Sequence, residues 1–153
     1  MSLRVGIGYD SHRFVAGRPL ILGGVEVPHE RGLAGHSDAD VLTHALIDAL
    51  LGACGQGDIG RRFPPDDERW SGADSIALLR TVLAELPGEP ANADLTVICE
   101  QPRLGPHRAA IEQRLGDALA APVSVKATSN EGMGFIGRGE GIAAIAVALV
   151  NGS

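Results

Sequence analysis

Residues 3–12 read LRVGIGYDSH, an apolar stretch that ends in Asp10-Ser11-His12. Alternation along a strand over residues 4–10 places Asp10 and His12 on the same face, so two possible metal ligands converge there. A third, His44, lies in the helical pattern that follows. One carboxylate and two imidazoles with a fourth position open are typical of a catalytic zinc site. A strand-end Asp and His also serve as a turn cap and a solvated ring, so the rest of the chain decides between the two interpretations.

The remaining pattern alternates strands and helices around this first strand. We expect strands at 4–10, 20–22, 25–27, 95–99 and 123–127, and helices at 38–53, 74–85 and 106–120. Gly23-Gly24 supplies the turn of a hairpin. The apolar run 142–150 fits a buried strand or a buried helix equally well. No linker or repeat interrupts this order, so we predict one layered α/β or α+β domain over residues 1–153.

Composition narrows the partners and the compartment. A chain of 153 residues buries roughly two-thirds of its unfolded surface. Its net charge of −6 disfavours nucleic acid and anionic membranes as partners. We find neither a bilayer-length apolar run nor a basic-then-apolar leader. Cys54 and Cys99 lack metal-type spacing, and we expect them to be reduced core residues of a cytoplasmic protein.

The first long helix carries a polar stripe. Ser37 and Asp40 have the spacing of a capping box, so we expect Ser37 to cap this helix. Asp40, His44 and Asp48 follow at intervals of four residues along one face. This stripe is either a solvated row of local salt links or a histidine oriented toward metal by flanking carboxylates. His36 and Ser37 stand at the N-terminus of the helix, where free backbone amides favour phosphate.

Three loops carry further polar groups. The segments 58–60 (DIG) and 63–67 (FPPDD) are either plain connections or grips for the hydroxyls of a polar substrate. In KATSNE, residues 126–131, hydroxyls suit phosphate oxygens and Glu131 suits a magnesium-like cation. The glycine-rich segment 134–141 has neither Walker-A nor dinucleotide spacing, and an ion pair accounts for its Arg138 and Glu140.

Four segments in this order, 35–40 (GHSDAD), 58–60, 126–128 and 137–141 (GRGEG), resemble the 2-C-methyl-D-erythritol 2,4-cyclodiphosphate synthase family over nearly the whole chain. The resemblance implies a homotrimer of ferredoxin-like α/β subunits, each with a mixed sheet covered by helices, and active sites between neighbours. It implies the metal-dependent cyclisation of 4-diphosphocytidyl-2-C-methyl-D-erythritol 2-phosphate, with release of CMP, in non-mevalonate isoprenoid biosynthesis. It also leaves room for an isoprenoid ligand on the threefold axis.

The same resemblance assigns roles to residues. It places a zinc-type ion on Asp10, His12 and His44, and Mg or Mn on Glu131 together with the substrate diphosphate. His36 and Ser129 are expected to stabilise the transition state, and 99–105 to hold cytidine. The expected substrate contacts are Asp10, Ser11, His12, His36, Ser37, Asp58, Ile59, Gly60, Phe63, Asp67, Pro102, Arg103, Leu104, Gly105, Thr128, Ser129, Asn130, Glu131, Phe135 and Arg138.

Two departures from the family pattern and two rival functions remain open. Pro65 stands where the family often has Asp, which removes a carboxylate and an amide donor, and Ser129-Asn130 replaces a pair of threonines. A metal-dependent phosphohydrolase would use the same metals to activate water. A trimeric isoprenoid-binding module would need no intact triad, so the triad favours an enzyme. We also expect 137–141 and the apolar run after it, including Ile142, to lie at a subunit interface.

Overall fold

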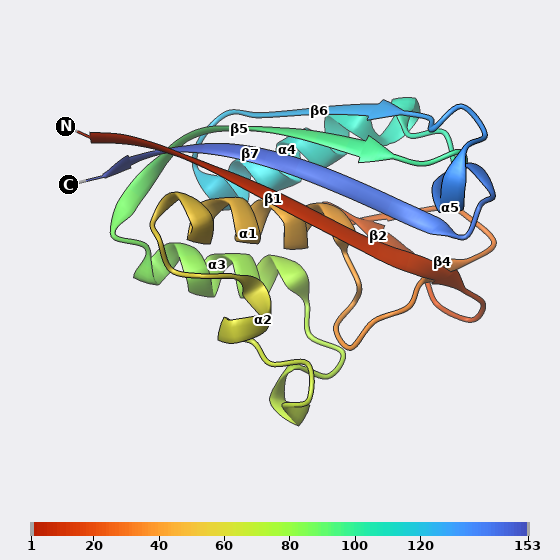
Figure 1. Ribbon diagram of the computed structural model, residues 1–153, viewed down its shortest axis with the longest axis horizontal. Coiled ribbons are helices and arrows are strands. Elements are labelled where there is room, and N and C mark those ends of the chain that lie inside the picture. The colour runs from red at the N-terminus through yellow and green to blue at the C-terminus, as the bar shows by residue number, and fades with distance from the viewer. Residues whose placement is uncertain (1, 153) are drawn as a thin grey trace.

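The computed structural model describes residues 2–152 and contains a five-stranded mixed sheet with helices packed against one face (Figure 1). The strand order is β4-β1-β7-β5-β6, in which only the β5–β6 pair is parallel. The bounds are β1 Ser2–Val15, β4 Gly32–Leu33, β5 Gly88–Ile98, β6 Val123–Thr128 and β7 Gly141–Gly152, and a separate hairpin joins β2 Leu20–Leu22 to β3 Val25–Val27. The predicted layered α/β class is confirmed.

The apolar run at the C-terminus is strand β7, which pairs with β1 over its full length, from Ser2 opposite Gly152 to Arg13 opposite Gly141. Its side chains alternate between the two faces of the sheet. Ile142 is 0% exposed and belongs to the core, whereas Val147 on the other face is 40% exposed. The expectation that Ile142 lies at a subunit interface is therefore wrong, because this side chain already faces the helices of its own subunit.

Three long helices, over residues 41–53, 75–85 and 108–119, lie on one side of the sheet, the first and third directly against its strands and the second outside them. The helices are α1 Val41–Ala53, α2 Ile59–Arg62, α3 Ser75–Glu85, α4 Arg108–Leu119 and α5 Gly134–Gly137, with short 3₁₀ turns η1 Glu68–Trp70 and η2 Gly105–His107. Helix α1 packs on β1 and β7, α4 packs on β6, and α3 lies against both α1 and α4. Almost every residue of α1 is buried, since it lies between the sheet and α3.

The N-cap of α1 is Asp40, whose carboxylate accepts the amide of Thr43, and not Ser37 as the capping-box spacing predicted. The same carboxylate accepts the amides of Gly23 and Gly24 at 2.8 and 2.7 Å. Both glycines have positive φ, so the β2–β3 turn presents two adjacent N–H groups that a residue with a side chain would present only at a cost. Burial raises the pKa of Asp40, although its hydrogen bonds oppose the shift. Asp40 thus fastens the hairpin to the start of α1.

Helix α1 approaches β1 unusually closely, through Gly6 and Gly8. A Cβ at Gly8 would lie 2.8 Å from the amide nitrogen of Ala49 and closer still to the carbonyl oxygen of Ala45. A Cβ at Gly6 would meet the backbone of Ala49 in the same way. Only glycine allows the two backbones to come this near. The contact brings the first half of α1, which carries His44, close to the second half of β1, which carries Asp10 and His12.

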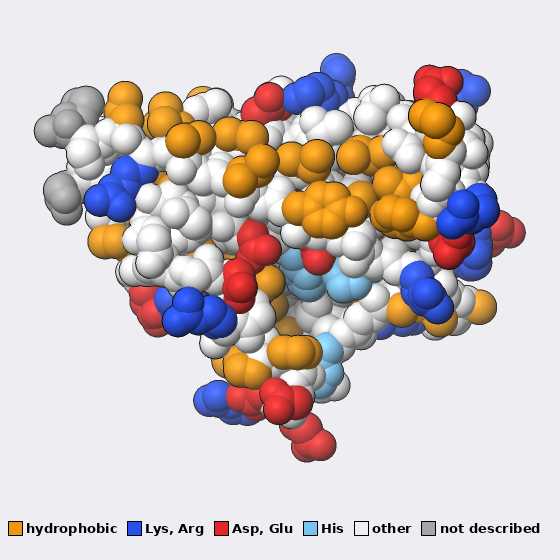
Figure 2. Space-filling view, viewed as in Figure 1, with side chains coloured by type: hydrophobic (Ala, Val, Ile, Leu, Met, Phe, Trp, Pro, Cys, Tyr) orange, Lys and Arg blue, Asp and Glu red, His pale blue; other side chains and the backbone are white. Residues whose placement is uncertain are grey.

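The face of the sheet away from the helices is apolar and uncovered in the subunit. Leu3, Val5, Ile7 and Tyr9 alternate along β1 and are 53–70% exposed. Figure 2 shows a band of hydrophobic side chains along this part of the molecule. An exposed patch of this kind marks an interaction surface. Within residues 2–152, no helix combines the length and apolar character needed to cross a bilayer.

Candidate metal centre and substrate site

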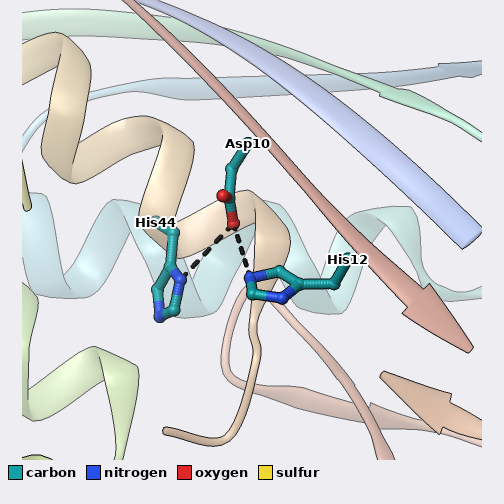
Figure 3. A group of neighbouring side chains, drawn as sticks. All are labelled: Asp10, His12 and His44. Carbon is teal, nitrogen blue, oxygen red and sulfur yellow. Dashed lines mark ion pairs between the residues drawn. The ribbon is translucent and has the colours of Figure 1, made fainter. Parts of the chain in front are cut away.

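Asp10 and His12, in the second half of β1, converge with His44 on the first half of α1 (Figure 3). Oδ2 of Asp10 lies 2.9 Å from Nε2 of His12 and 3.4 Å from Nδ1 of His44. One ligand atom from each residue lies within 4.8 Å of the other two. The prediction that alternation along the first strand brings Asp10 and His12 to one face is confirmed, and the helix supplies the third member.

The hydrogen bonds around these side chains leave lone pairs directed at one another. Nδ1 of His12 lies 2.8 Å from the carbonyl oxygen of Ala34, which can only accept, so this nitrogen carries the proton of the neutral ring. Nε2 of His12 and Oδ2 of Asp10 are buried and face each other at 2.9 Å, and apart from this mutual contact neither atom has a hydrogen-bond partner among the described residues. Two lone-pair atoms in such proximity need a cation between them. Two imidazole nitrogens and one carboxylate oxygen suit Zn²⁺, with a fourth position left for substrate.

The pKa shifts of Asp10 and His12 also favour a positive charge between these two side chains. Burial alone would raise the pKa of Asp10, but the hydrogen bonds and charges of His12 and His44 outweigh burial and lower it. Burial alone would lower the pKa of His12, but the hydrogen bond and charge of Asp10 outweigh burial and raise it. A proton on His12 and a metal ion at this point therefore compete for the same electron pairs.

A cavity of about 180 Å³ opens onto the triad. Its lining combines the three ligands with residues of the predicted substrate segments and two residues that sequence reasoning missed, Trp70 and Leu78. The predicted ones are Asp10, His12, His36, Ser37, His44, Ile59, Gly60, Phe63 and Pro65. Figure 2 shows histidine side chains gathered in this hollow, below the apolar band. Trp70 packs edge-on against Phe63 with ring centroids 4.8 Å apart. Nothing in the spacing of Trp70 or Leu78 connects them with the triad.

Two carboxylates hold the loop after α1 in place by accepting hydrogen bonds from backbone amides of the same chain. Asp48 accepts the amide of Ile59 at 2.7 Å, and Asp58 caps α2 through the amide of Arg61. Nε2 of His36 lies 3.0 Å from the carbonyl oxygen of Asp67. These bonds fix the wall of the cavity, and the side chain of Asp58 serves as a helix cap whether or not it also contacts substrate.

A second group of predicted residues follows β6. The carboxylate of Glu100 accepts the amides of Asn130 and Gly132 at 3.0 and 2.7 Å, on either side of Glu131. Glu131 itself adopts a φ of 55°, a left-handed conformation that is unfavourable for a side chain. Oγ of Ser129 lies 3.4 Å from a carboxylate oxygen of Glu131. Glu100 therefore holds the turn that presents Glu131, a role that the sequence analysis missed.

The predicted cytidine segment lies next to this turn. Leu104 and Gly105 line a cavity of about 250 Å³ together with Arg108, Ile111, Val125, Lys126 and Ala127. The amide of Cys99 donates to the carbonyl oxygen of Thr128, which ties the segment to the end of β6. Pro102 and Arg103 lie in the same connection. The second group is thus continuous, although Glu131 is not part of the histidine triad.

The remaining predicted residues lie near the start of β7. Ser11 and Phe135 line a third cavity with Arg13 and Glu140, and His12 borders both this cavity and that of the triad. Ser11 thus projects away from Asp10, as alternation along β1 requires. Nε of Arg138 pairs with a carboxylate oxygen of Glu140 at 2.8 Å, which confirms the expected ion pair.

Fold and site together define an α/β protein with a group of three side chains suited to a divalent metal at the wall of a largely apolar pocket. The model of the YgbB family matches residues 3–151. The chain belongs to the YgbB family.

The chain is 59% identical to a 2-C-methyl-D-erythritol 2,4-cyclodiphosphate synthase of Symbiobacterium thermophilum, over 97% of this chain and 98% of that one. A synthase of the same name from Moorella thermoacetica is 54% identical, over 97% and 94% of the two chains. A solved 2C-methyl-D-erythritol-2,4-cyclodiphosphate synthase, in a form bound to CDP, superposes with a TM-score of 0.88 at 38% identity, covering 97% of this chain and all of that one. The bifunctional IspDF of Campylobacter jejuni superposes with a TM-score of 0.93 at 37% identity, and the match covers 97% of this chain and 42% of that protein.

Proposed function

We propose that this chain is a lyase that converts 4-diphosphocytidyl-2-C-methyl-D-erythritol 2-phosphate into 2-C-methyl-D-erythritol 2,4-cyclodiphosphate, with release of CMP, in the cytoplasm. The observation that carries the proposal is the intact Asp10, His12 and His44 group at the cavity wall, in a chain that matches synthases of this name almost end to end. The reaction supplies isoprenoid precursors by the non-mevalonate route.

The substrate provides its own nucleophile, so the protein needs none. The 2-phosphate attacks the β-phosphorus of the diphosphate in the same molecule, and CMP leaves with the electrons of the broken P–O bond. Holding the two ends of the substrate in line contributes up to roughly 7–11 kcal/mol for well-oriented intramolecular reactions. The pocket formed by Ile59, Gly60, Phe63 and the missed Trp70 supplies a wall against which the substrate can fold.

Charge is the main obstacle, because two anionic phosphates must meet in a protein of net charge −6. A divalent ion on Asp10, His12 and His44 would neutralise and polarise the β-phosphate. His36 and Ser37 lie at the same cavity, where the hydroxyl of Ser37 can donate a hydrogen bond to a phosphate oxygen, and His36, whose Nε2 faces the carbonyl oxygen of Asp67, can donate through Nδ1 in its imidazolium form. We assign His36 to stabilisation of the transition state on this basis.

The residues after β6 would bind the nucleotide end. Thr128 and Ser129 offer hydroxyls to the diphosphate, and Glu131 can hold Mg²⁺ or Mn²⁺ together with phosphate oxygens. The segment 99–105 would recognise cytidine through its backbone. The Glu100 carboxylate keeps this half of the site in shape, because it fixes the turn on both sides of Glu131.

We further propose that the active protein is a homotrimer in which each site is completed by a neighbour. The uncovered apolar row on β1, from Leu3 to Tyr9, supports this assembly. Burying such side chains contributes about 1.5–3 kcal/mol each. A partner on this face would also cover a surface that a solitary subunit leaves in water.

Phosphorus-31 NMR of the reaction with the cytidylated substrate and Mg²⁺ tests the activity. We expect the substrate signals to be replaced by those of CMP and a cyclic diphosphate. Asp10→Asn should abolish turnover, because an amide is a poor ligand for zinc. Asp117→Asn is the matched control, since Asp117 lies on α4 and bonds only the side chain of Gln113. Full activity in Asp10→Asn would contradict the proposal.

A further inference from the structure

We propose that Ser75 and Asp38 are positioning residues that hold the proton of His44 on Nε2 and so keep its Nδ1 lone pair directed at the metal centre. The inference rests on the proposed metal site and deepens it. Asp38 lies in the GHSDAD segment but was given no role there, and Ser75 belongs to no motif, because it lies 31 positions after His44 and reaches it only through tertiary packing.

The geometry places two side chains, Ser75 and Asp38, in a row behind the histidine. Oγ of Ser75 lies 2.8 Å from Nε2 of His44, on the side of the ring opposite to Asp10. The hydroxyl of Ser75 donates to one carboxylate oxygen of Asp38, and the amide of Ser75 donates to the other at 3.0 Å. Ser75 is 0% exposed, so water cannot substitute for either partner.

The available hydrogens fix the direction of this row. The carboxylate of Asp38 only accepts, so the single hydroxyl hydrogen of Ser75 is committed to Asp38. The oxygen of Ser75 then acts as an acceptor toward His44, and the proton of the neutral imidazole must lie on Nε2. Nδ1 is left with its lone pair facing Oδ2 of Asp10, which is the state that a metal ligand requires.

Ser37 offers a competing arrangement, because its Oγ lies 3.1 Å from the same Nε2. If Ser37 donated to Nε2, the proton of His44 would sit on Nδ1 and point to Asp10 over 3.4 Å. That arrangement would leave the close oxygen of Ser75 facing a lone pair at 2.8 Å. The row through Ser75 avoids this repulsion. It also frees the hydroxyl hydrogen of Ser37, which lines the cavity, for an anionic oxygen of the substrate.

The direct test uses the whole protein with its histidines labelled with nitrogen-15 and zinc as the probe. Long-range proton–nitrogen correlation spectra of the zinc-loaded protein should show His44 protonated at Nε2 and bound at Nδ1. Ser75→Ala should weaken zinc binding by roughly 10–100-fold, the range for losing a partner behind a metal-bound histidine. Ser75→Thr keeps the hydroxyl and should restore affinity toward the wild-type value.

Thr43→Val is the matched control. It also removes a buried hydroxyl that donates to an aspartate, Asp40, but this hydroxyl does not contact His44. We expect its zinc affinity to stay at the wild-type value, which separates positioning from a general loss of stability.

Three results would overturn the proposal. Zinc-loaded wild-type protein with His44 protonated at Nδ1 would refute it even if Ser75→Ala failed to fold. Zinc affinity that is equal in wild type and Ser75→Ala would refute the positioning role alone and leave the metal site standing. A wild-type protein that binds no zinc at the triad would refute the metal site and the positioning role together.

Discussion

Replacing Gly8 by Ala should weaken the metal centre, because the added Cβ would push α1, which carries His44, away from β1, which carries Asp10 and His12. Cβ contacts under 3.0 Å essentially do not occur, and a Cβ at Gly8 would lie about 1 Å inside that limit against the carbonyl oxygen of Ala45. Both partners are backbone, so no flexible side chain can yield. Helix α1 must therefore retreat by roughly 1 Å at this point.

The retreat acts on the site because Gly8 lies two residues before Asp10 and Ala45 directly follows His44. Metal–ligand distances tolerate about 0.2 Å, and misplacing a functional group by 1 Å can cost about 100-fold. We expect zinc affinity to fall by at least about 100-fold. Overpacking a rigid contact costs up to about 3 kcal/mol, which lowers Tm by roughly 6–12 °C for a chain of this size.

Two further glycine-to-alanine variants provide a graded comparison and a control for Gly8→Ala. Gly6→Ala creates the same kind of clash one helical turn farther from His44, so it should lose similar stability and less zinc affinity. Gly52→Ala is the control on α1 itself, because its nearest neighbour would be the carbonyl oxygen of Ile7 at 3.8 Å. It should be neutral or stabilise by up to about 1 kcal/mol. Wild-type Tm and zinc affinity in Gly8→Ala, measured by thermal unfolding and competition with a chelator, would refute the reasoning.

The site and the uncovered sheet face lead to four other predictions. The pKa of His12 is raised above its ordinary 6.5 and that of Asp10 is lowered, so zinc affinity should fall as the pH drops, starting above pH 6.5. If zinc displaces one proton, its affinity changes by about tenfold per pH unit. A zinc affinity that is flat between about pH 8 and about pH 6 would contradict this prediction. In the metal-free protein the sign is opposite: the stability from the His12 proton is complete below pH 6.5 and is lost as the pH rises through the raised pKa of His12, as a thermal unfolding series at several pH values would detect. Ile7→Asp should yield folded monomers by light scattering, since Ile7 is 70% exposed in the subunit, and a variant that remains trimeric would remove β1 from the interface. Glu100→Gln should slow turnover while leaving zinc affinity unchanged, because an amide nitrogen cannot accept from Asn130 or Gly132 and one charge-assisted bond, worth about 1.5–3 kcal/mol, is lost; unchanged turnover would show that the turn needs no such anchor.

The first strand was predictable because its information is local. Alternation along β1 already places Asp10 and His12 together, and this pairing needs no knowledge of the rest of the chain. The Gly23-Gly24 turn was predictable for the same reason, since positive φ is a property of single residues. His44 was a candidate third ligand from its residue type, but only the resemblance decided for it, because its polar stripe fits a solvated helix face equally well.

The rest depends on tertiary packing. Helix α1 is apolar almost all round, so packing on both sides buries most of its polar stripe as well. The helix begins at Val41, so its N-cap is Asp40, although Ser37 has the spacing of a capping box. Ser75 and Glu100 act on residues about 30 positions away, and no periodicity records such contacts. Ile142 was placed on the wrong face because an unbroken apolar run does not reveal which of its alternate side chains meets the helices.

The measurement that tests the central claim most directly is the reaction of the cytidylated substrate in water enriched in oxygen-18. Attack by the 2-phosphate of the substrate admits no water, so we expect CMP and the cyclic diphosphate in equal amounts, both unlabelled by mass spectrometry, and no inorganic phosphate. Substrate that lacks the 2-phosphate should react poorly, because only an external nucleophile would remain. Label in CMP or in the remaining diphosphate, or efficient turnover without the 2-phosphate, would contradict the account and identify a hydrolase that activates water at the same metal centre.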